Sequence, residues 1–135
     1  MLGRLNHVAI AVTDLKSATN TYRDILGAKV GEPLDQPEHG VTVVFIELPN
    51  TKVELITPLG ENSPIFNFLN KNKNGGIHHI CYEVKNLELS INILMKNNYK
   101  IIGDNPKIGA HGKPVIFLHP SGFDGTLIEL QEEWN

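Results

Sequence analysis

The sequence predicts an α+β fold in which two tandem βαβββ modules form one curved mixed sheet with a cleft. An internal repeat is the first reason for this prediction. The strand-like stretch LNHVAIAVTDL resembles IHHICYEVKNL in the second half, and the match aligns His7 with His79. Near the end of each half, KVELI resembles TLIEL, which aligns Glu54 with Glu129. The same order of strand-like and helix-like patterns in both halves indicates two copies of one unit.

Length and composition agree with a single globular domain. The chain has 135 residues and divides into module 1 (about 1–62), a linker (about 63–74) and module 2 (about 75–135). A net charge of −3 gives no reason to expect nucleic acid or an anionic membrane as a partner. The single cysteine, Cys81, excludes an internal disulfide, and no apolar run is long enough to cross a membrane.

Module 1 begins with a predicted strand at 5–12. A helix follows, with Thr13 or Asp14 as its N-cap and Gly27 just beyond its end. We expect three further strands, near 29–33, 41–48 and 52–57. The apolar residues of the helix recur at helical spacing, at Leu15, Ala18, Tyr22, Ile25 and Leu26.

Module 2 repeats this plan after a linker that contains a short helix following Pro64. The pattern predicts a strand at 77–84 and a helix from about 87 to 97. Trp134 is expected to pack against the other module or a partner subunit. Three further strands are expected at 100–102, 115–118 and 125–131.

Strand alternation separates the polar residues of the repeat from the apolar ones. Successive side chains of a strand point to opposite faces. By this count His7, Glu54, His79 and Glu129 each lie on the face away from the helix of their module. The neighbouring His78 falls on the helix side, or caps the strand, and is expected to be structural.

Two imidazoles and two carboxylates can converge if the two modules join into one curved sheet. Nitrogen and oxygen ligands of this kind form sites for divalent metals. Taken one at a time, each of the four side chains is explained as well or better by a structural hydrogen bond. Their recurrence at matching points of the two halves favours the metal site.

Several stretches, spread over nearly the whole chain, resemble one known family. GGIHHICYEV and KIGAHGKPVIFLHP are the most specific, and LNHVAIAVTDL, TKVELITPLG and GTLIEL also match. The chain resembles the vicinal oxygen chelate superfamily and, within it, the methylmalonyl-CoA epimerase family. The resemblance implies metal ligands at His7, Glu54, His79 and Glu129, with Co²⁺ as the expected ion and Mn²⁺, Ni²⁺, Zn²⁺ or Mg²⁺ as alternatives. Some bacterial relatives carry an additional candidate catalytic glutamate on the third strand, where this chain has Val43, so that base is not expected here.

The resemblance also implies an activity. We expect a metal-dependent epimerase that interconverts (R)- and (S)-methylmalonyl-CoA through an enediolate, with Glu54 and Glu129 as acid and base. In the GAHGKP loop, His111 and Lys113 are candidate contacts for the acyl-CoA substrate, although an exposed turn is an equally good reading. A homodimer is expected by analogy. The metabolic role would be propionate or branched-chain catabolism, in the bacterial cytoplasm or, after removal of a transit peptide, in the mitochondrial matrix.

Three other functions compete with the epimerase. A glyoxalase I-type lyase acting on a glutathione thiohemiacetal would use the same ion and the same enediolate chemistry. An iron extradiol dioxygenase is disfavoured by the short chain and by the fourth ligand candidate. A metal-free drug-binding protein of the same fold predicts loss of the polar quartet, and all four residues are present.

Overall fold

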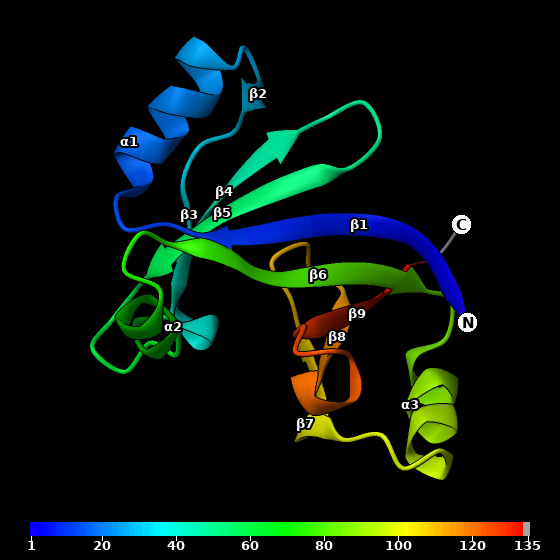
Figure 1. The fold of residues 1–135 in the computed structure, drawn as a ribbon. Helices are drawn as coiled ribbons and strands as arrows, with labels where there is room; N and C mark the ends of the chain where they lie inside the picture. Colours follow the sequence, from blue (N-terminus) through cyan, green and yellow to red (C-terminus); the bar gives the residue numbers. More distant parts are fainter. Residues whose placement is uncertain (134–135) are drawn as a thin grey trace. The chain divides into compact units, whose positions relative to one another are not determined.

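The fold is that of a computed structural model, which describes residues 1–133 (Figure 1). The chain forms two compact units. The N-terminal unit comprises residues 7–78, and the C-terminal unit comprises residues 1–6 together with residues 79 onward. Trp134, for which we expected a packing role, lies outside the described residues.

The N-terminal unit holds one mixed group of strands, in the order β2-β4-β5-β1, with β3 also paired to β4. Strand β5 runs parallel to β1 and antiparallel to β4 (Figure 1). Parallel β1 and β5 are joined through the helix and the β2–β4 strands between them, as a parallel pair requires. The elements from the N-terminus to the linker are β1 (Leu2–Ala11), α1 (Leu15–Asn20), the π-helical turn η1 (Thr21–Ile25), β2 (Lys29–Val30), β3 (Leu34–Gln36), the 3₁₀ turn η2 (Pro37–His39), β4 (Val41–Glu47), β5 (Lys52–Pro58) and α2 (Ile65–Lys71).

The C-terminal unit has the strand order β6-β9-β8-β7. Strand β9 runs parallel to β6 and antiparallel to β8, so it takes the place that β5 has in the other unit. The first residues of β1 are tied to β6 by hydrogen bonds from Arg4 and Asn6 to the buried Glu83. The elements are β6 (Gly76–Val84), α3 (Leu87–Lys96), β7 (Ile101–Ile108), β8 (Pro114–Leu118), the 3₁₀ turn η3 (Pro120–Gly122) and β9 (Ile128–Glu132).

The first long helix of each unit begins with the same cap. Asp14 accepts a hydrogen bond from the backbone N–H of Ser17, and Asn86 accepts one from that of Leu89, at 3.0 and 2.9 Å. The two cap residues share nearly the same backbone angles, φ −138° with ψ 101° and φ −138° with ψ 103°. Side-chain oxygens at this position satisfy N–H groups that the helix itself leaves unpaired. The predicted cap at Asp14 is therefore confirmed.

Four elements differ from the sequence-based expectation. The last strand starts at Ile128 rather than Gly125, because Gly125 has a φ of +77° and its N–H bonds to Pro120 O in a turn. Strand β7 extends to Ile108, far beyond the expected residue 102, and β3 was not expected at all. The first helix widens into a π-helical turn at Thr21–Ile25 before Gly27 ends it with a φ of +68°.

Hydrophobic clusters pack between the strands and the helices of each unit. In the N-terminal unit, one cluster packs against α1, and a second, on the other face, packs against α2. In the C-terminal unit the main cluster lies under α3. The buried members are Val44, Ile46 and Leu55 under α1; Ala9, Ala11, Val43, Ile56 and Ile65 on the α2 side; and Val84, Leu87, Leu94, Ile116, Leu118, Ile128 and Leu130 under α3.

The α+β class and the two βαβββ modules are confirmed, with β3 as an addition to the first module. The short helix after Pro64 is also confirmed, as α2. Within residues 1–133, no helix combines the length and apolar character needed to cross a membrane.

Candidate metal and proton-transfer site

The N-terminal unit brings His7 and Glu54 into direct contact. His7 Nδ1 lies 2.9 Å from Glu54 Oε2, and both residues are buried, at 2 % and 4 % exposure. The parallel pairing of β1 with β5 sets Glu54 opposite Ala9, so the carboxylate reaches back by one side-chain row to the imidazole. Their neighbours Val53 and Leu55 pack on the α1 side instead.

The C-terminal unit repeats this arrangement with His79 and Glu129. His79 Nε2 lies 3.2 Å from Glu129 Oε1, and both residues are buried, at 7 % and 6 % exposure. Glu129 stands opposite Cys81 in the parallel β6–β9 pair, again one row from the histidine. The ring of Phe117 meets the His79 ring edge to face, with centroids 5.3 Å apart and an interplanar angle of 89°. This contact restrains the orientation of the imidazole.

The two adjacent histidines of β6 therefore make different contacts. His78 packs edge to face on Phe68 of α2, with ring centroids 5.1 Å apart. His79 pairs with Glu129 as described. Alternation accounts for the split, because one step along a strand reverses the face. The helix that His78 meets is α2 of the linker, however, and not α3 of its own module as expected.

The two pairs have the donor chemistry of a divalent-metal site. Each pair offers one imidazole nitrogen and one carboxylate oxygen, the ligand types favoured by Zn²⁺, Co²⁺ and Mn²⁺. Bonds of about 2.0–2.2 Å place two neighbouring ligand atoms of one ion about 3 Å apart in octahedral coordination and about 3.4 Å apart in tetrahedral coordination. The observed N···O separations of 2.9 and 3.2 Å lie close to this range and are also those of a direct hydrogen bond. The spacing inside each pair is therefore compatible with two ligands of one ion.

The GAHGKP loop joins β7 to β8 in the C-terminal unit. His111 is half-buried, and Lys113 Nζ donates a hydrogen bond to Glu133 Oε1 at 3.0 Å. The other carboxylate oxygen of Glu133 accepts a hydrogen bond from Gln131 at 2.9 Å. Burial acts to raise the pKa of Glu133, but the hydrogen bonds from Gln131 and Lys113 and the charges of Lys113 and His111 hold that pKa below its ordinary value.

Two of these residues, Gln131 and Glu133, were not among the predicted site residues. Gln131 is 2 % exposed and follows Glu129 on the same face of β9. The strand alternation that identified Glu129 also places Gln131 on that face, so the signal was present in the sequence. Glu133 lies just beyond the strand, where alternation no longer assigns a face.

Val43 is the position at which the sequence resemblance implied a glutamate in some bacterial relatives. It is 1 % exposed and packs with Ala9, Ala11 and Ile56 on the α2 side of the sheet. An apolar, tightly packed side chain supplies no proton acceptor there. Val43 itself therefore cannot act as a base.

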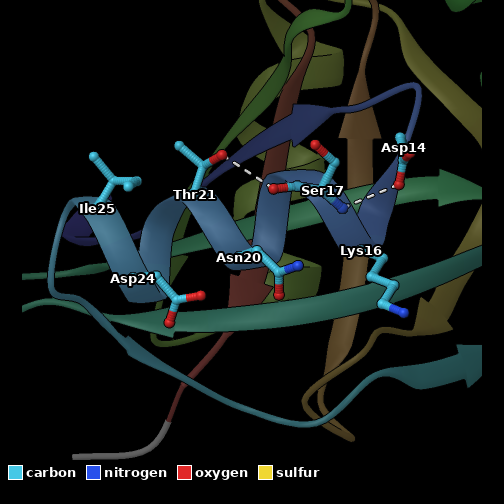
Figure 2. A pocket seen from close by; sticks show the side chains of 7 residues that line it. All are labelled: Asp14, Lys16, Ser17, Asn20, Thr21, Asp24 and Ile25. Atoms are coloured by element: carbon cyan, nitrogen blue, oxygen red, sulfur yellow. Dashed lines mark hydrogen bonds between the residues drawn. The ribbon is translucent and has the colours of Figure 1, made fainter.

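A surface depression follows the outer side of α1 and η1, between Asp14 and Ile25 (Figure 2). Two of its polar side chains make hydrogen bonds within the helix: Asp14 accepts from the Ser17 N–H, and Thr21 Oγ1 donates to the Ser17 carbonyl. None of the predicted site residues lines it.

Comparison with known proteins assigns the family. Residues 6–117 match the model of the glyoxalase/bleomycin resistance protein/dioxygenase superfamily. The ethylmalonyl-CoA/methylmalonyl-CoA epimerase of Cereibacter sphaeroides is 60 % identical over 98 % of this chain and 99 % of its own. The mitochondrial methylmalonyl-CoA epimerase of Bos taurus is 57 % identical over 97 % of this chain and 75 % of its own.

A solved structure supports the same assignment. It is a methylmalonyl-CoA epimerase in complex with methylmalonyl-CoA and NH₄⁺, and it covers 98 % of this chain and 96 % of its own with a TM-score of 0.90 and 27 % identity. The chain therefore belongs to the glyoxalase/bleomycin resistance protein/dioxygenase superfamily and, within it, to the methylmalonyl-CoA epimerase family of isomerases.

Proposed function

We propose that this chain interconverts (R)- and (S)-methylmalonyl-CoA by removing and replacing the α-proton with the help of a divalent metal. The observation that carries the proposal is the buried His–Glu pair found at the same strand positions of each unit, His7 with Glu54 and His79 with Glu129. The family assignment supplies the substrate class, since the relatives named above are epimerases of methylmalonyl-CoA.

The proposed metal ligands are His7, Glu54, His79 and Glu129, with Co²⁺ as the preferred ion. A bound divalent ion supplies positive charge that stabilises the enediolate left when the carbon between a thioester and a carboxylate loses its proton. Each of the two histidines would supply one imidazole nitrogen to the ion. The apolar residues on the same faces, including Val43 and Phe117, limit the access of water.

Proton transfer is proposed to fall to Glu54 and Glu129. Epimerisation requires a group on each side of the reacting carbon, one to remove the proton and one to return it. One carboxylate in each module provides two such groups. A carboxylate that also ligates a cation is a weaker base, because the cation lowers its pKa. We assign Glu129 as a ligand first, and Glu54 as the residue that combines ligand and base.

Substrate binding is proposed to involve the loop between β7 and β8. The imidazole of His111 and the ammonium of Lys113 can meet anionic oxygens of the acyl-CoA. We further propose a homodimer, and a role in propionate or branched-chain catabolism in the bacterial cytoplasm or the mitochondrial matrix.

The decisive experiment follows the α-proton of methylmalonyl-CoA by NMR in deuterated water. Protein is stripped with a chelator and then supplied with Co²⁺, and His79→Ala is compared with His78→Ala. The proposal expects metal-dependent exchange and epimer interconversion in the wild type and in His78→Ala, but not in His79→Ala. No exchange with any divalent ion would reject the epimerase activity, and glutathione thiohemiacetals would then be tested as glyoxalase substrates.

Glu54→Gln separates the two roles of that residue. If Glu54 is a base, the substitution reduces turnover by about 10²-fold or more while bound Co²⁺, measured by elemental analysis, falls much less. A loss of metal that parallels the loss of turnover would show that Glu54 acts as a ligand alone.

A further inference from the structure

The loop between β7 and β8 has a defined shape. The Gly109 N–H donates to the Lys113 carbonyl at 2.9 Å, and the Gly112 N–H donates to the Gly109 carbonyl at 3.0 Å. Gly112 has a φ of +74°, which a residue without a Cβ adopts at little cost. A Cβ on Gly109 would lie 2.9 Å from Val115 Cγ1, so this end of the loop sits close against β8.

The loop is also fastened through a side chain. Lys113 Nζ and Gln131 Nε2 donate to separate oxygens of Glu133, at 3.0 and 2.9 Å. Gln131 is buried at 2 % exposure, and the Glu133 N–H donates to the Val84 carbonyl at 2.9 Å. Glu133 is therefore held at its backbone and at both carboxylate oxygens. The Lys113 ammonium has a fixed partner rather than the freedom of an ordinary surface lysine.

The pairing leaves Lys113 able to bind another anion. An ammonium has three N–H donors, and the hydrogen bond to Glu133 uses one of them. The Lys113 side chain is 36 % exposed, whereas that of Glu133 is 20 % exposed. Lys113 is therefore the member of the pair that is more accessible to a ligand. The lowered pKa of Glu133 keeps its carboxylate ionised at neutral pH, so the partner remains charged.

We propose that Glu133 is a positioning residue for substrate binding, which acts by aiming the Lys113 ammonium at an anionic group of the acyl-CoA. This inference rests on the proposed function, because it takes the acyl-CoA as the ligand. The shared chemistry is an anionic oxygen group, which can be the carboxylate of the acyl part or a phosphate of the CoA part. Glu133 touches neither and works through Lys113 alone.

The adjacent Glu132 provides a matched control. Its carboxylate points to the other face and accepts a hydrogen bond from the Leu87 N–H at the start of α3, at 2.9 Å. Glu132→Gln and Glu133→Gln therefore make the same chemical change one residue apart. Only the second change reaches Lys113.

The test compares steady-state kinetics of these two variants. Glu133→Gln is expected to raise KM for methylmalonyl-CoA by about tenfold with kcat changed less than about twofold, since a charge-assisted contact is weakened before the chemical step. Lys113→Met is expected to raise KM similarly, and the double variant to add little more. Glu132→Gln is expected to lower Tm but leave KM unchanged.

The affinities for two CoA esters, malonyl-CoA and acetyl-CoA, identify the anionic group that Lys113 contacts. If Lys113 contacts the carboxylate, Lys113→Met weakens the binding of malonyl-CoA but not that of acetyl-CoA. If Lys113 contacts a phosphate, the substitution weakens the binding of both CoA esters equally. Calorimetry with the metal-loaded protein measures both ligands, and either pattern supports the inference.

Other outcomes overturn it. An unchanged KM in Glu133→Gln, or an equal rise in Glu132→Gln, would show that the Lys113–Glu133 pair is merely structural. In both cases the wild-type activity, and with it the proposed function, stands. A wild type without activity on methylmalonyl-CoA and without affinity for either CoA ester would reject the proposed function and this inference together.

Discussion

The contact between Phe117 and His79 shows how one apolar residue can tune a polar one. The two rings meet edge to face at 5.3 Å and 89°, while His79 Nε2 lies 3.2 Å from Glu129 Oε1. Edge-to-face packing on an aromatic face adds a modest attraction and fixes the plane of the imidazole. A ligand whose orientation is fixed in advance loses less entropy when it binds a metal.

If His79 ligates the metal as proposed, Phe117→Leu should weaken metal binding by about tenfold, because the imidazole gains freedom while its donor atom is retained. Titration of the stripped protein with Co²⁺ measures the affinity. Phe68→Leu is the control, since Phe68 makes the corresponding contact with His78. Equal weakening in both variants would point to a general loss of packing instead.

Asn6 and Arg4 contribute unequally to the carboxylate they share. Asn6 is buried and donates to Glu83 Oε2 at 2.9 Å, whereas Arg4 is 73 % exposed and contacts Oε1 at 3.2 Å. Asn6→Ala should cost about 1–3 kcal/mol of unfolding free energy, because a buried carboxylate oxygen loses its donor. Arg4→Ala should cost about 0–1 kcal/mol, as exposed pairs do. Urea unfolding measures both, and equal losses would contradict this ranking.

The Lys113–Glu133 pair predicts a pH dependence of stability. The pKa of Glu133 is lowered in the folded chain, so the stabilisation is present above the unfolded pKa of about 4.3 and is lost as the pH falls through the lower folded value. The stability difference between wild type and Lys113→Met should be constant near neutral pH and shrink below about pH 4. Urea midpoints across this range measure it. A difference that persists unchanged at low pH would show that the pair is not the cause.

The sequence predicts the sheet face of each candidate site residue, because strand alternation is a local pattern. Strand alternation placed His7, Glu54, His79 and Glu129 on the faces that the structure shows within each unit. Alternation could not reveal Glu133, because its role depends on a loop that lies about twenty residues earlier in the chain.

At the scale of elements, equal caps and equal strand pairings mark the two modules as copies of one design. Asp14 and Asn86 start their helices with the same hydrogen bond, and β1–β5 and β6–β9 are both parallel pairs. The caps and the helix patterns were readable from sequence because they depend on neighbours three or four residues away. The start of β9 was not, since a turn at Gly125 interrupts a stretch that otherwise reads as strand. The unexpected length of β7 has a different origin, because pairing with β8 holds its far end at Lys107 and Ile108.

Gly75 marks a close approach between two elements of the N-terminal unit. A Cβ there would lie 2.5 Å from the Ala11 carbonyl oxygen, and Gly75 has a φ of +81°. Gly60 has a similar φ of +84° but open space around it. Gly75→Ala should therefore destabilise the chain by clearly more than Gly60→Ala, whose cost is the left-handed backbone alone, about 1–2 kcal/mol. Thermal unfolding of the two variants checks the order, and equal losses would mean that the strand end shifts freely.

At the scale of the whole molecule, metal binding and folding are coupled if the proposed ligands are correct. A ligand that binds only the folded chain stabilises it by about 2.7 kcal/mol at a concentration one hundred times its Kd. Excess Co²⁺ should therefore raise the Tm of the stripped wild type by several degrees, and His79→Ala should show little of this shift. Differential scanning calorimetry measures both. A shift of the same size in His79→Ala would place the stabilising ion elsewhere.

The sequence repeat predicted the α+β class and the modular plan because both depend on pattern alone. The identity of the metal is not predictable in this way, since imidazole and carboxylate ligands suit several divalent ions. The choice between neighbouring functions of one fold is likewise decided by pocket residues rather than by the pattern of strands.

The parallel strand pairs also have a consequence for how the chain acquires its activity. His7 and Glu54, like His79 and Glu129, are separated by about fifty residues of chain, and each pair meets only when the first and last strands of its half are aligned. Contacts so remote in sequence form slowly during folding. Each half of a chain emerging from the ribosome therefore lacks its donor pair until that half is almost complete. If these residues ligate the metal as proposed, metal capture would report that the corresponding half has folded.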